Sequence, residues 1–122
     1  WNHKYEINLI RPISYVNRYI DPSWSTFINT PQFPEYPSGH SVSSNAAATV
    51  LTALVGNIAY VDDSHRDRGM PARAFESFQD AADEAARSRI YGGIHFPMGV
   101  QGGIAHGAAV GQLVIQRLNT RR

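Results

Sequence analysis

The sequence predicts an all-α fold, a helical bundle of which this chain forms the C-terminal part. Four segments carry apolar residues at helical spacing, none shows the alternation of a half-buried strand, and prolines and glycines separate them. The chain has 122 residues, 43% of them apolar, which suffices for part of one domain. The sequence begins at Trp1 with residues typical of the middle of a domain, so we expect the early helices in a preceding part of the same protein. We treat residues 1–122 as one unit, the C-terminal part of that domain.

Prolines, glycines and polar loops bound the predicted helices. The first spans about residues 4–20 with a break at Pro12, because proline cannot continue the helical hydrogen-bond ladder. An irregular, proline-rich stretch follows at 21–39. Three further helices are predicted at about 40–60, 71–91 and 100–118, with a polar loop at 62–70, a stop at Gly92-Gly93 and a basic tail at 117–122.

Composition excludes several classes of protein. The formal net charge is only +1, which gives no basic field for nucleic acid, so a bound anion has to be held by a local cluster. The absence of cysteine excludes disulfides, thiol catalysis and thiolate metal ligands. No apolar run reaches the roughly 18 residues that suggest a membrane span. The uncharged stretch 41–60 is rich in Ser, Thr, Asn and Ala, which indicates a buried helix and no membrane partner.

Three clusters of basic and small polar residues carry the functional signal. In the first, Lys4 and Arg11 are seven residues apart, nearly two helical turns, so both side chains are predicted to leave the same helix face. Two stacked cations repel each other unless an anion lies between them. A solvated basic face is the alternative.

The second cluster, Ser38-Gly39-His40, precedes the long uncharged helix. A helix N-terminus offers unpaired N–H groups and the positive end of the dipole, which favours an anion. Gly39 leaves the backbone open to a ligand, and His40 is predicted to be half-buried and able to move protons near neutral pH. A plain N-cap role for Ser38 is the structural alternative.

The third cluster consists of Arg89 and His95. The predicted buried stripe of the third helix, which Arg89 continues, is Phe75, Phe78, Ala82 and Ala85. A guanidinium facing a core is costly unless it is paired, and the neighbouring segments show no inward carboxylate. The sequence therefore predicts a ligand that supplies the negative charge, with an internal salt bridge as the alternative. Gly92-Gly93 would let the chain turn His95 back toward the same place.

In order and internal spacing the clusters resemble one signature, Lys4-x6-Arg11-Pro12, Pro37-Ser38-Gly39-His40 and Ser88-Arg89-x5-His95. It is the signature of a superfamily that unites vanadium-dependent haloperoxidases, bacterial non-specific acid phosphatases and type 2 phosphatidic acid phosphatases. The match spans Lys4 to His95 and looks most like bacterial haloperoxidases. It implies a helical bundle of the haloperoxidase and acid phosphatase type.

The resemblance implies that the clusters converge on one vanadate, with phosphate able to occupy the same place. By position, the residues that would hold the oxyanion are Lys4, Arg11, Ser38, Gly39, Arg89 and His95. His95 would be the vanadium ligand, His40 the acid–base residue, and hydrogen peroxide and a halide the substrates. In the second hypothesis, a soluble acid phosphatase, His95 would attack the phosphorus of a phosphate ester and His40 would protonate the leaving oxygen.

One position departs from the family pattern. The family usually has an aspartate four residues after the histidine, where it orients the ring, and here that position is Gly99. We therefore expect another group, such as a backbone carbonyl, to orient His95, which favours a metal ligand over a nucleophile. Gly99 also supports a third hypothesis, a non-catalytic oxyanion-binding homologue.

The resemblance also bears on substrate and partners. Phe33 lies seven residues before His40, where the family places a side chain beside the cofactor, and phenylalanine there is a slight hint of chloride. We expect the chain to need the preceding N-terminal part of the same protein for stability, and a homo-oligomer is a further option. A periplasmic or secreted location is slightly favoured.

Overall fold

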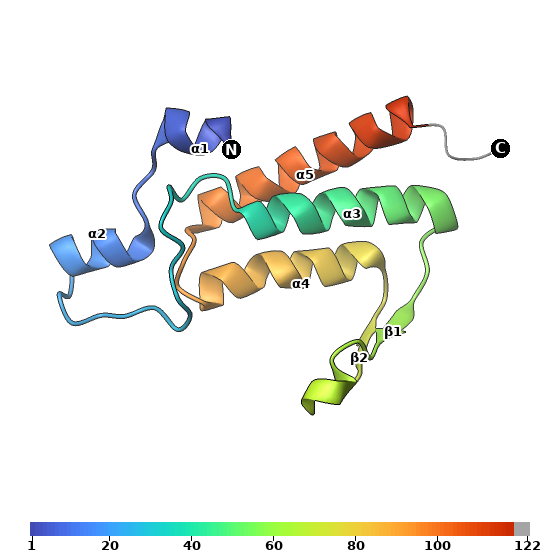
Figure 1. The fold of residues 1–122 in the computed structure, drawn as a ribbon, viewed down its shortest axis with the longest axis horizontal. Coiled ribbons are helices and arrows are strands. Elements are labelled where there is room, and N and C mark those ends of the chain that lie inside the picture. The colour runs from blue at the N-terminus through green and yellow to red at the C-terminus, as the bar shows by residue number, and fades with distance from the viewer. Residues whose placement is uncertain (119–122) are drawn as a thin grey trace.

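The computed structural model describes residues 1–118, and three long helices form its body (Figure 1). They are α3 (Gly39–Val55), α4 (Phe78–Tyr91) and α5 (Pro97–Arg117). α3 packs against both of the others, and successive helices run in opposite directions, so α3 and α5 are parallel. The predicted helical bundle is confirmed. Arg121 and Arg122 of the predicted basic tail lie outside the described residues.

The predicted break at Pro12 divides the first helical segment in two. α1 (Asn2–Ile7) ends where Asn8 takes a left-handed conformation with φ 49°. α2 (Pro12–Tyr19) begins at Pro12 itself, whose missing N–H costs nothing in a first helical turn. Residues 21–38, all of them described, contain no helix or strand, as predicted.

A two-stranded hairpin joins α3 to α4, where the sequence predicted only helix and polar loop. β1 (Tyr60–Asp62) pairs antiparallel with β2 (Arg73–Phe75), and a 3-10 helix, η1 (Arg66–Arg68), lies at the tip. The rings of Tyr60 and Phe75 pack together across the strands, with centroids 5.6 Å apart. This aromatic contact between residues opposite each other stabilises the hairpin, which projects from the bundle (Figure 1).

The helices on either side of the hairpin are shorter than predicted. α3 ends at Val55 and does not reach Tyr60, because the next residue, Gly56, has a φ of 90° that suits glycine. α4 begins at Phe78 because Ser77 caps it, accepting a hydrogen bond from the N–H of Asp80 at 2.9 Å. The predicted start at Pro71 was therefore wrong.

α5 packs against α3 at close range because a row of glycines lies on its contact face. A glycine recurs every four residues along α5; Gly103, Gly107 and Gly111 face α3, whereas Gly99 faces the side chain of Glu35. A Cβ added at Gly103 would lie 2.7 Å from the backbone oxygen of Ser38, and one at Gly111 would lie 2.6 Å from the Cβ of Thr49. Both distances are too short for real atoms, so the α3–α5 contact depends on glycine.

Small residues fill much of the bundle interior. The buried apolar residues are Ala48, Phe75, Ala82, Ala86, Ile94 and Val100. Many large apolar side chains lie at the surface instead, among them Trp1 at 75% exposed and Phe27 at 90%. Within residues 1–118, no helix is both long enough and apolar enough to cross a bilayer.

Candidate functional site

Segments far apart in the sequence meet at one end of the bundle, which we call the site end (Figure 1). α3 begins there, α4 ends there, and the chain turns there into α5. This places Ser38, Gly39 and His40 at the same end as Arg89, in the last turn of α4, and His95, just before α5. The order of the helices therefore brings the second and third predicted clusters together.

Lys4 and Arg11 reach the site end by a route that was not predicted. They do not share a helix face, because Lys4 lies in α1 and Arg11 is the N-cap of α2. Each is only 6% exposed, so the solvated-face alternative is wrong. Both face the ring of Phe33, whose centroid lies 5.0 Å from Lys4 Nζ and 5.1 Å from Arg11 Cζ. The aromatic ring holds the two cations in one place.

The Lys4 ammonium is held by the proline-rich loop that precedes α3. Nζ donates to the carbonyl oxygens of Pro34 at 3.1 Å, Glu35 at 3.0 Å and Pro37 at 2.6 Å. The pKa of Lys4 is lowered from 10.5 to about 8, first by burial and then by the charge of Arg11, while Glu35 opposes both. The loop uses all three N–H donors of the ammonium, so Lys4 contributes mainly positive charge to the site and no free hydrogen-bond donor.

Arg11 connects the proline-rich loop to the turn between α4 and α5. Its Nε donates to the carbonyl of Phe33 at 2.8 Å, and its Nη1 donates to the carbonyl of Ile94 at 2.8 Å and lies 3.2 Å from His95 Nε2. Its Nη2 is buried without a hydrogen-bond partner among residues 1–118. A buried guanidinium N–H without a partner is a place for a negatively charged acceptor.

Arg89 is the second guanidinium with an unpaired buried atom. Its Nε has no hydrogen-bond partner, and it forms no salt bridge, within the described part of the chain. Burial lowers the pKa of Arg89. The internal salt bridge is therefore not seen, and an acceptor for Nε has to come from elsewhere.

The buried stripe beneath Arg89 differs from the predicted one. Ala82 and Ala86 are buried, Ala85 is only half-buried, and Phe75 lies in β2. Arg89 itself is half-buried at the edge of this stripe. The position of Arg89 next to the core was predicted correctly, although the buried stripe includes Ala86 in place of Ala85.

The first turn of α3 directs backbone donors at the site end. Ser38 is the N-cap of α3, which was the structural alternative given for it above. Its Oγ accepts hydrogen bonds from the N–H of Ser41 at 3.3 Å and from the Ser41 hydroxyl at 2.8 Å. The N–H groups of Gly39 and His40 cannot be satisfied within the helix. A Cβ added at Gly39 would meet nothing within 4 Å, so the backbone there is open to a ligand.

His40 lies at the mouth of the site. It is exposed, where half-burial was predicted. Partial burial lowers the pKa of His40 below the usual 6.5, and the electrostatic influence of Arg89 and of His95 lowers it further. Near pH 7 its imidazole is therefore neutral and able to accept a proton.

His95 is held by a carboxylate, where the sequence predicted a group such as a backbone carbonyl. Its ring is buried, and Nδ1 forms a hydrogen bond with Oε1 of Glu35, a side chain with no exposure to solvent. The expectation that no carboxylate points inward was also wrong. Glu35 is the only acidic residue between Asp21 and Asp62 and lies in an apolar, proline-rich stretch. Its isolation is the sequence signal of a buried carboxylate.

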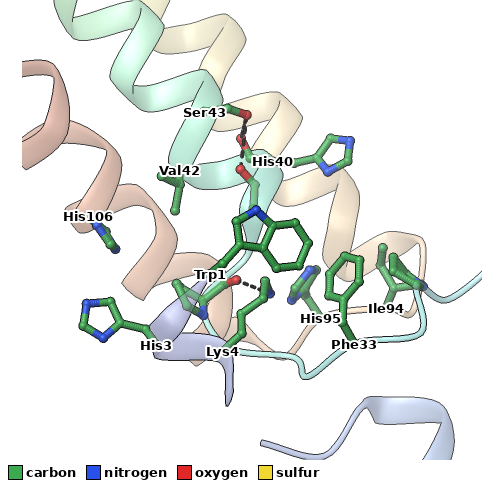
Figure 2. A pocket seen from close by; sticks show the side chains of 13 residues that line it. Trp1, His3, Lys4, Phe33, His40, Val42, Ser43, Ile94, His95 and His106 are labelled. Atoms are coloured by element: carbon green, nitrogen blue, oxygen red, sulfur yellow. Dashed lines mark hydrogen bonds between the residues drawn. The ribbon is translucent and has the colours of Figure 1, made fainter. Parts of the chain in front are cut away.

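A pocket of about 400 Å³ opens beside these groups (Figure 2). Four of the predicted site residues line it, namely Lys4, Gly39, His40 and His95, whereas Arg11, Ser38 and Arg89 do not. The rings of Trp1 and Phe33 pack edge to face on its wall, with centroids 5.0 Å apart. Positive charge, open backbone donors and a buried imidazole thus surround one cavity, an arrangement that suits an oxyanion.

One family of known domains matches most of the chain. Residues 17–122 match the VCPO second helical-bundle domain. The chain belongs to this family. No curated protein sequence matches it significantly.

Solved structures place this VCPO-type bundle among bacterial haloperoxidases, as the sequence signature indicated. A bacterial vanadium-dependent iodoperoxidase matches 98% of the chain at 48% identity with a TM-score of 0.92. Holo and apo structures of a bacterial vanadium-dependent chloroperoxidase each match 95% at 19% identity, with TM-scores of 0.78 and 0.76, which shows a shared fold. The chain spans 29% of the iodoperoxidase and 31 to 32% of the chloroperoxidase chains.

Proposed function

We propose that this bundle carries the vanadate site of a vanadium-dependent haloperoxidase, which oxidises a halide with hydrogen peroxide. The observation that carries the proposal is the state of His95. Its Nδ1 bonds the carboxylate of Glu35, and its Nε2 faces a guanidinium, Arg11, that still has an unpaired N–H. A buried imidazole whose Nε2 lone pair is held only by this guanidinium would be suited to ligate the metal of an oxyanion once the guanidinium turned to the oxyanion.

The donor set fits vanadate. Arg11 and Arg89 each have a buried N–H without a partner in residues 1–118, and Gly39 offers a first-turn backbone N–H. The residues that would hold the group are Lys4, Arg11, Ser38, Gly39, Arg89 and His95. When bound, vanadate supplies the electrophilic centre that activates hydrogen peroxide.

The charges of the site support an oxyanion with two negative charges. Lys4, Arg11 and Arg89 bring three positive charges, and Glu35 brings one negative charge, while burial keeps His95 neutral near pH 7. The net formal charge of two is best balanced by a dianion, since a buried excess charge of either sign destabilises the site.

His40 is proposed as the acid–base residue. Its lowered pKa leaves a ring nitrogen free to accept a proton from hydrogen peroxide at neutral pH. His40 lines the same pocket as His95, so a proton donor bound there lies within the reach of both rings.

We propose iodide as the preferred halide. The relative at 48% identity is an iodoperoxidase, and the 19% identity to the chloroperoxidase supports no transfer of substrate. The hint of chloride from Phe33 is weaker, because Phe33 here also serves to hold the Lys4 and Arg11 side chains.

A phosphatase remains the second candidate because of Glu35. We expected Gly99 to disfavour a nucleophilic His95 for want of a carboxylate, but Glu35 supplies one. A carboxylate at Nδ1 would stabilise the cationic phosphohistidine. Family membership supports the haloperoxidase, whereas this contact serves either chemistry.

We further propose that residues 1–122 complete a larger catalytic domain. The chain is about a third of the length of the matched haloperoxidases, and it exposes large apolar residues such as Trp1 and Tyr91, at 75% and 83%. A preceding part of the same protein would cover such residues and remove their apolar surface from water.

The test compares two activities of the full-length protein. We expect iodide oxidation that requires both hydrogen peroxide and added vanadate, and that is lost in His95→Ala. The matched control is His65→Ala, an exposed histidine near η1, which should oxidise iodide at the unaltered rate. Bromide and chloride assayed alongside rank the halides.

Aryl phosphate hydrolysis measured without vanadate separates the alternatives. Hydrolysis that vanadate inhibits, with no iodide oxidation, would replace the haloperoxidase with the phosphatase. Oxyanion binding with neither activity would leave a non-catalytic homologue.

A further inference from the structure

Glu35 is placed by its backbone as firmly as by its side chain. Its N–H donates to the carbonyl of Leu9 at 2.9 Å, and its own carbonyl accepts from Lys4 Nζ at 3.0 Å. Its side chain has no solvent exposure, and Oε1 accepts from His95 Nδ1 and from the N–H of Phe96 at 3.2 Å. The carboxylate therefore bonds the ring and the backbone just beyond it, which fixes both position and orientation.

The two contacts of the His95 ring determine which nitrogen carries the proton. A guanidinium can only donate, so the Nε2 that lies 3.2 Å from Arg11 Nη1 acts as the acceptor. A carboxylate accepts, so the Nδ1 that bonds Glu35 carries the hydrogen. The neutral ring is thereby held as the Nδ1–H tautomer, with the Nε2 lone pair on the side of the guanidinium.

Gly99 provides the space in which the Glu35 carboxylate lies. A Cβ added at residue 99 would be 2.6 Å from Glu35 Cδ and closer still to both of its carboxylate oxygens. Gly99 is buried in the first turn of α5, and its carbonyl accepts from the N–H of Ser38 at 2.9 Å, so the helix cannot easily shift away. The Glu35 carboxylate and a side chain at 99 therefore exclude each other.

From these contacts we infer that Glu35 is the positioning residue that fixes the tautomer of His95, and that positions 35 and 99 are alternative sources of one carboxylate. Glu35 acts through His95 and is not itself a ligand to the oxyanion. Its effect on oxyanion binding rests on the proposed function, but the tautomer can be measured without any ligand.

The exclusion suggests a rescue. In Glu35→Ala the carboxylate volume is empty, and an aspartate at 99 would direct its own carboxylate into that volume because its Cβ already lies there. The double variant Glu35→Ala/Gly99→Asp should therefore restore the Nδ1–H tautomer. Gly99→Asp alone should displace the Glu35 side chain, since two carboxylates cannot share the volume.

The experiment is nitrogen NMR of the full-length protein with ¹⁵N-labelled histidine, the His95 signals being assigned from their loss in His95→Ala. We expect the Nδ1–H pattern in the unaltered protein, its loss in Glu35→Ala, and its return in the double variant. Titration with vanadate should show affinity weakened roughly 10- to 100-fold in Glu35→Ala and largely recovered in the double variant. The matched control is Glu84→Ala, which removes a half-exposed carboxylate of α4 that pairs with Arg73, and it should change neither the tautomer nor the affinity.

Glu35→Gln covers the case in which Glu35→Ala does not fold. It keeps the shape of the side chain but removes the charge, so the Nδ1–H proton resonance should move upfield as the charge-assisted hydrogen bond weakens. An unaltered His95 spectrum in Glu35→Ala or Glu35→Gln would overturn the inference, and so would a folded double variant without the Nδ1–H pattern. If the tautomer follows the prediction while no variant binds vanadate, the inference stands and the proposed function fails.

Discussion

The two ends of the helical bundle differ in how far their charged side chains are exposed to solvent. At the site end, Arg11 and Glu35 are 6% and 0% exposed, and the guanidinium groups of Arg11 and Arg89 each keep a buried N–H without a partner in residues 1–118. At the hairpin end, Arg73 pairs with Glu84 at the surface, with side chains 57% and 43% exposed. Water screens the hairpin pair, whereas it hardly reaches the side chains of Arg11 and Glu35.

The difference indicates which charges serve the fold and which serve a ligand. A solvated ion pair contributes little to stability and does little harm when it is removed. A buried donor without an acceptor destabilises the ligand-free protein, so its presence requires another explanation. For Arg11 and Arg89, the oxyanion of the proposed function would be that explanation.

Replacing one arginine at each end should give the largest contrast. Arg89→Met removes a charge-assisted hydrogen bond of about 1.5–3 kcal/mol, so oxyanion affinity should fall roughly 10- to 100-fold. The same change removes an unpaired buried donor, so the ligand-free protein should unfold at the same or a higher temperature. Arg73→Met should alter stability by less than about 1 kcal/mol and leave affinity unchanged.

Thermal unfolding of the full-length protein with and without vanadate measures both quantities. Equal losses of vanadate protection in Arg89→Met and Arg73→Met would remove the distinction between the two ends. A strongly destabilised Arg89→Met protein would indicate that Arg89 has an internal partner.

The glycines of α5 allow a second contrast, between packing defects of equal size. Gly103→Ala lies near Ser38, and Gly111→Ala lies near Thr49 toward the other end. Both should destabilise the protein by about 1–3 kcal/mol, although alanine is the better helix former, because the added Cβ overlaps α3. Only Gly103→Ala should also weaken vanadate binding, since it displaces the start of α3. Urea unfolding and vanadate titration check this, and stabilisation by either change would show that the helices are not in close contact.

The smallest predicted effect is a pH dependence at the site end. The pKa of Lys4 is about 8 in the folded protein, so above pH 8 its ammonium loses its proton and oxyanion binding should weaken, by up to about tenfold at pH 9. Binding should then take up a proton. Folding stability should change in the opposite direction, because between about 8 and 10.5 the unfolded chain holds a proton that the folded chain has released, so the Lys4 contribution rises with pH.

The proton uptake can be measured by calorimetric titration with tungstate, an oxyanion that does not itself titrate in this pH range. The binding enthalpy is compared in buffers of different ionisation enthalpy, and its dependence on the buffer gives the number of protons taken up. Lys4→Met should abolish the uptake. Uptake that persists in Lys4→Met would assign the proton to another group.

The sequence predicted the site end better than the hairpin end, for a physical reason. Pro12 and Gly92-Gly93 act on the chain next to them, so the breaks they cause were readable. Strands of three residues leave no alternating pattern, and Phe75 fitted the helical stripe as well as it fits β2. Local signals were therefore sufficient at one end and misleading at the other.

Contacts between distant residues account for the remaining errors. Lys4 and Arg11 were expected to meet on one helix face, but they lie on either side of the break between α1 and α2, and both contact the ring of Phe33. Glu35 was missed because its partner His95 is sixty residues away, and no periodicity connects two single residues. Gly99 was recognised as a departure, yet its cause lies in the volume of another side chain.

The exclusion between Glu35 and a side chain at 99 changes how such a site should be searched for. A signature that demands an acid four residues after the histidine would reject this chain, although a carboxylate bonds the ring here. A search should instead consider both positions together and accept either an acid at 35 with glycine at 99, or an acid at 99 with a non-acidic residue at 35. Swapping a single position between chains of the two types would leave two carboxylates competing for one volume beside the imidazole, or no carboxylate there.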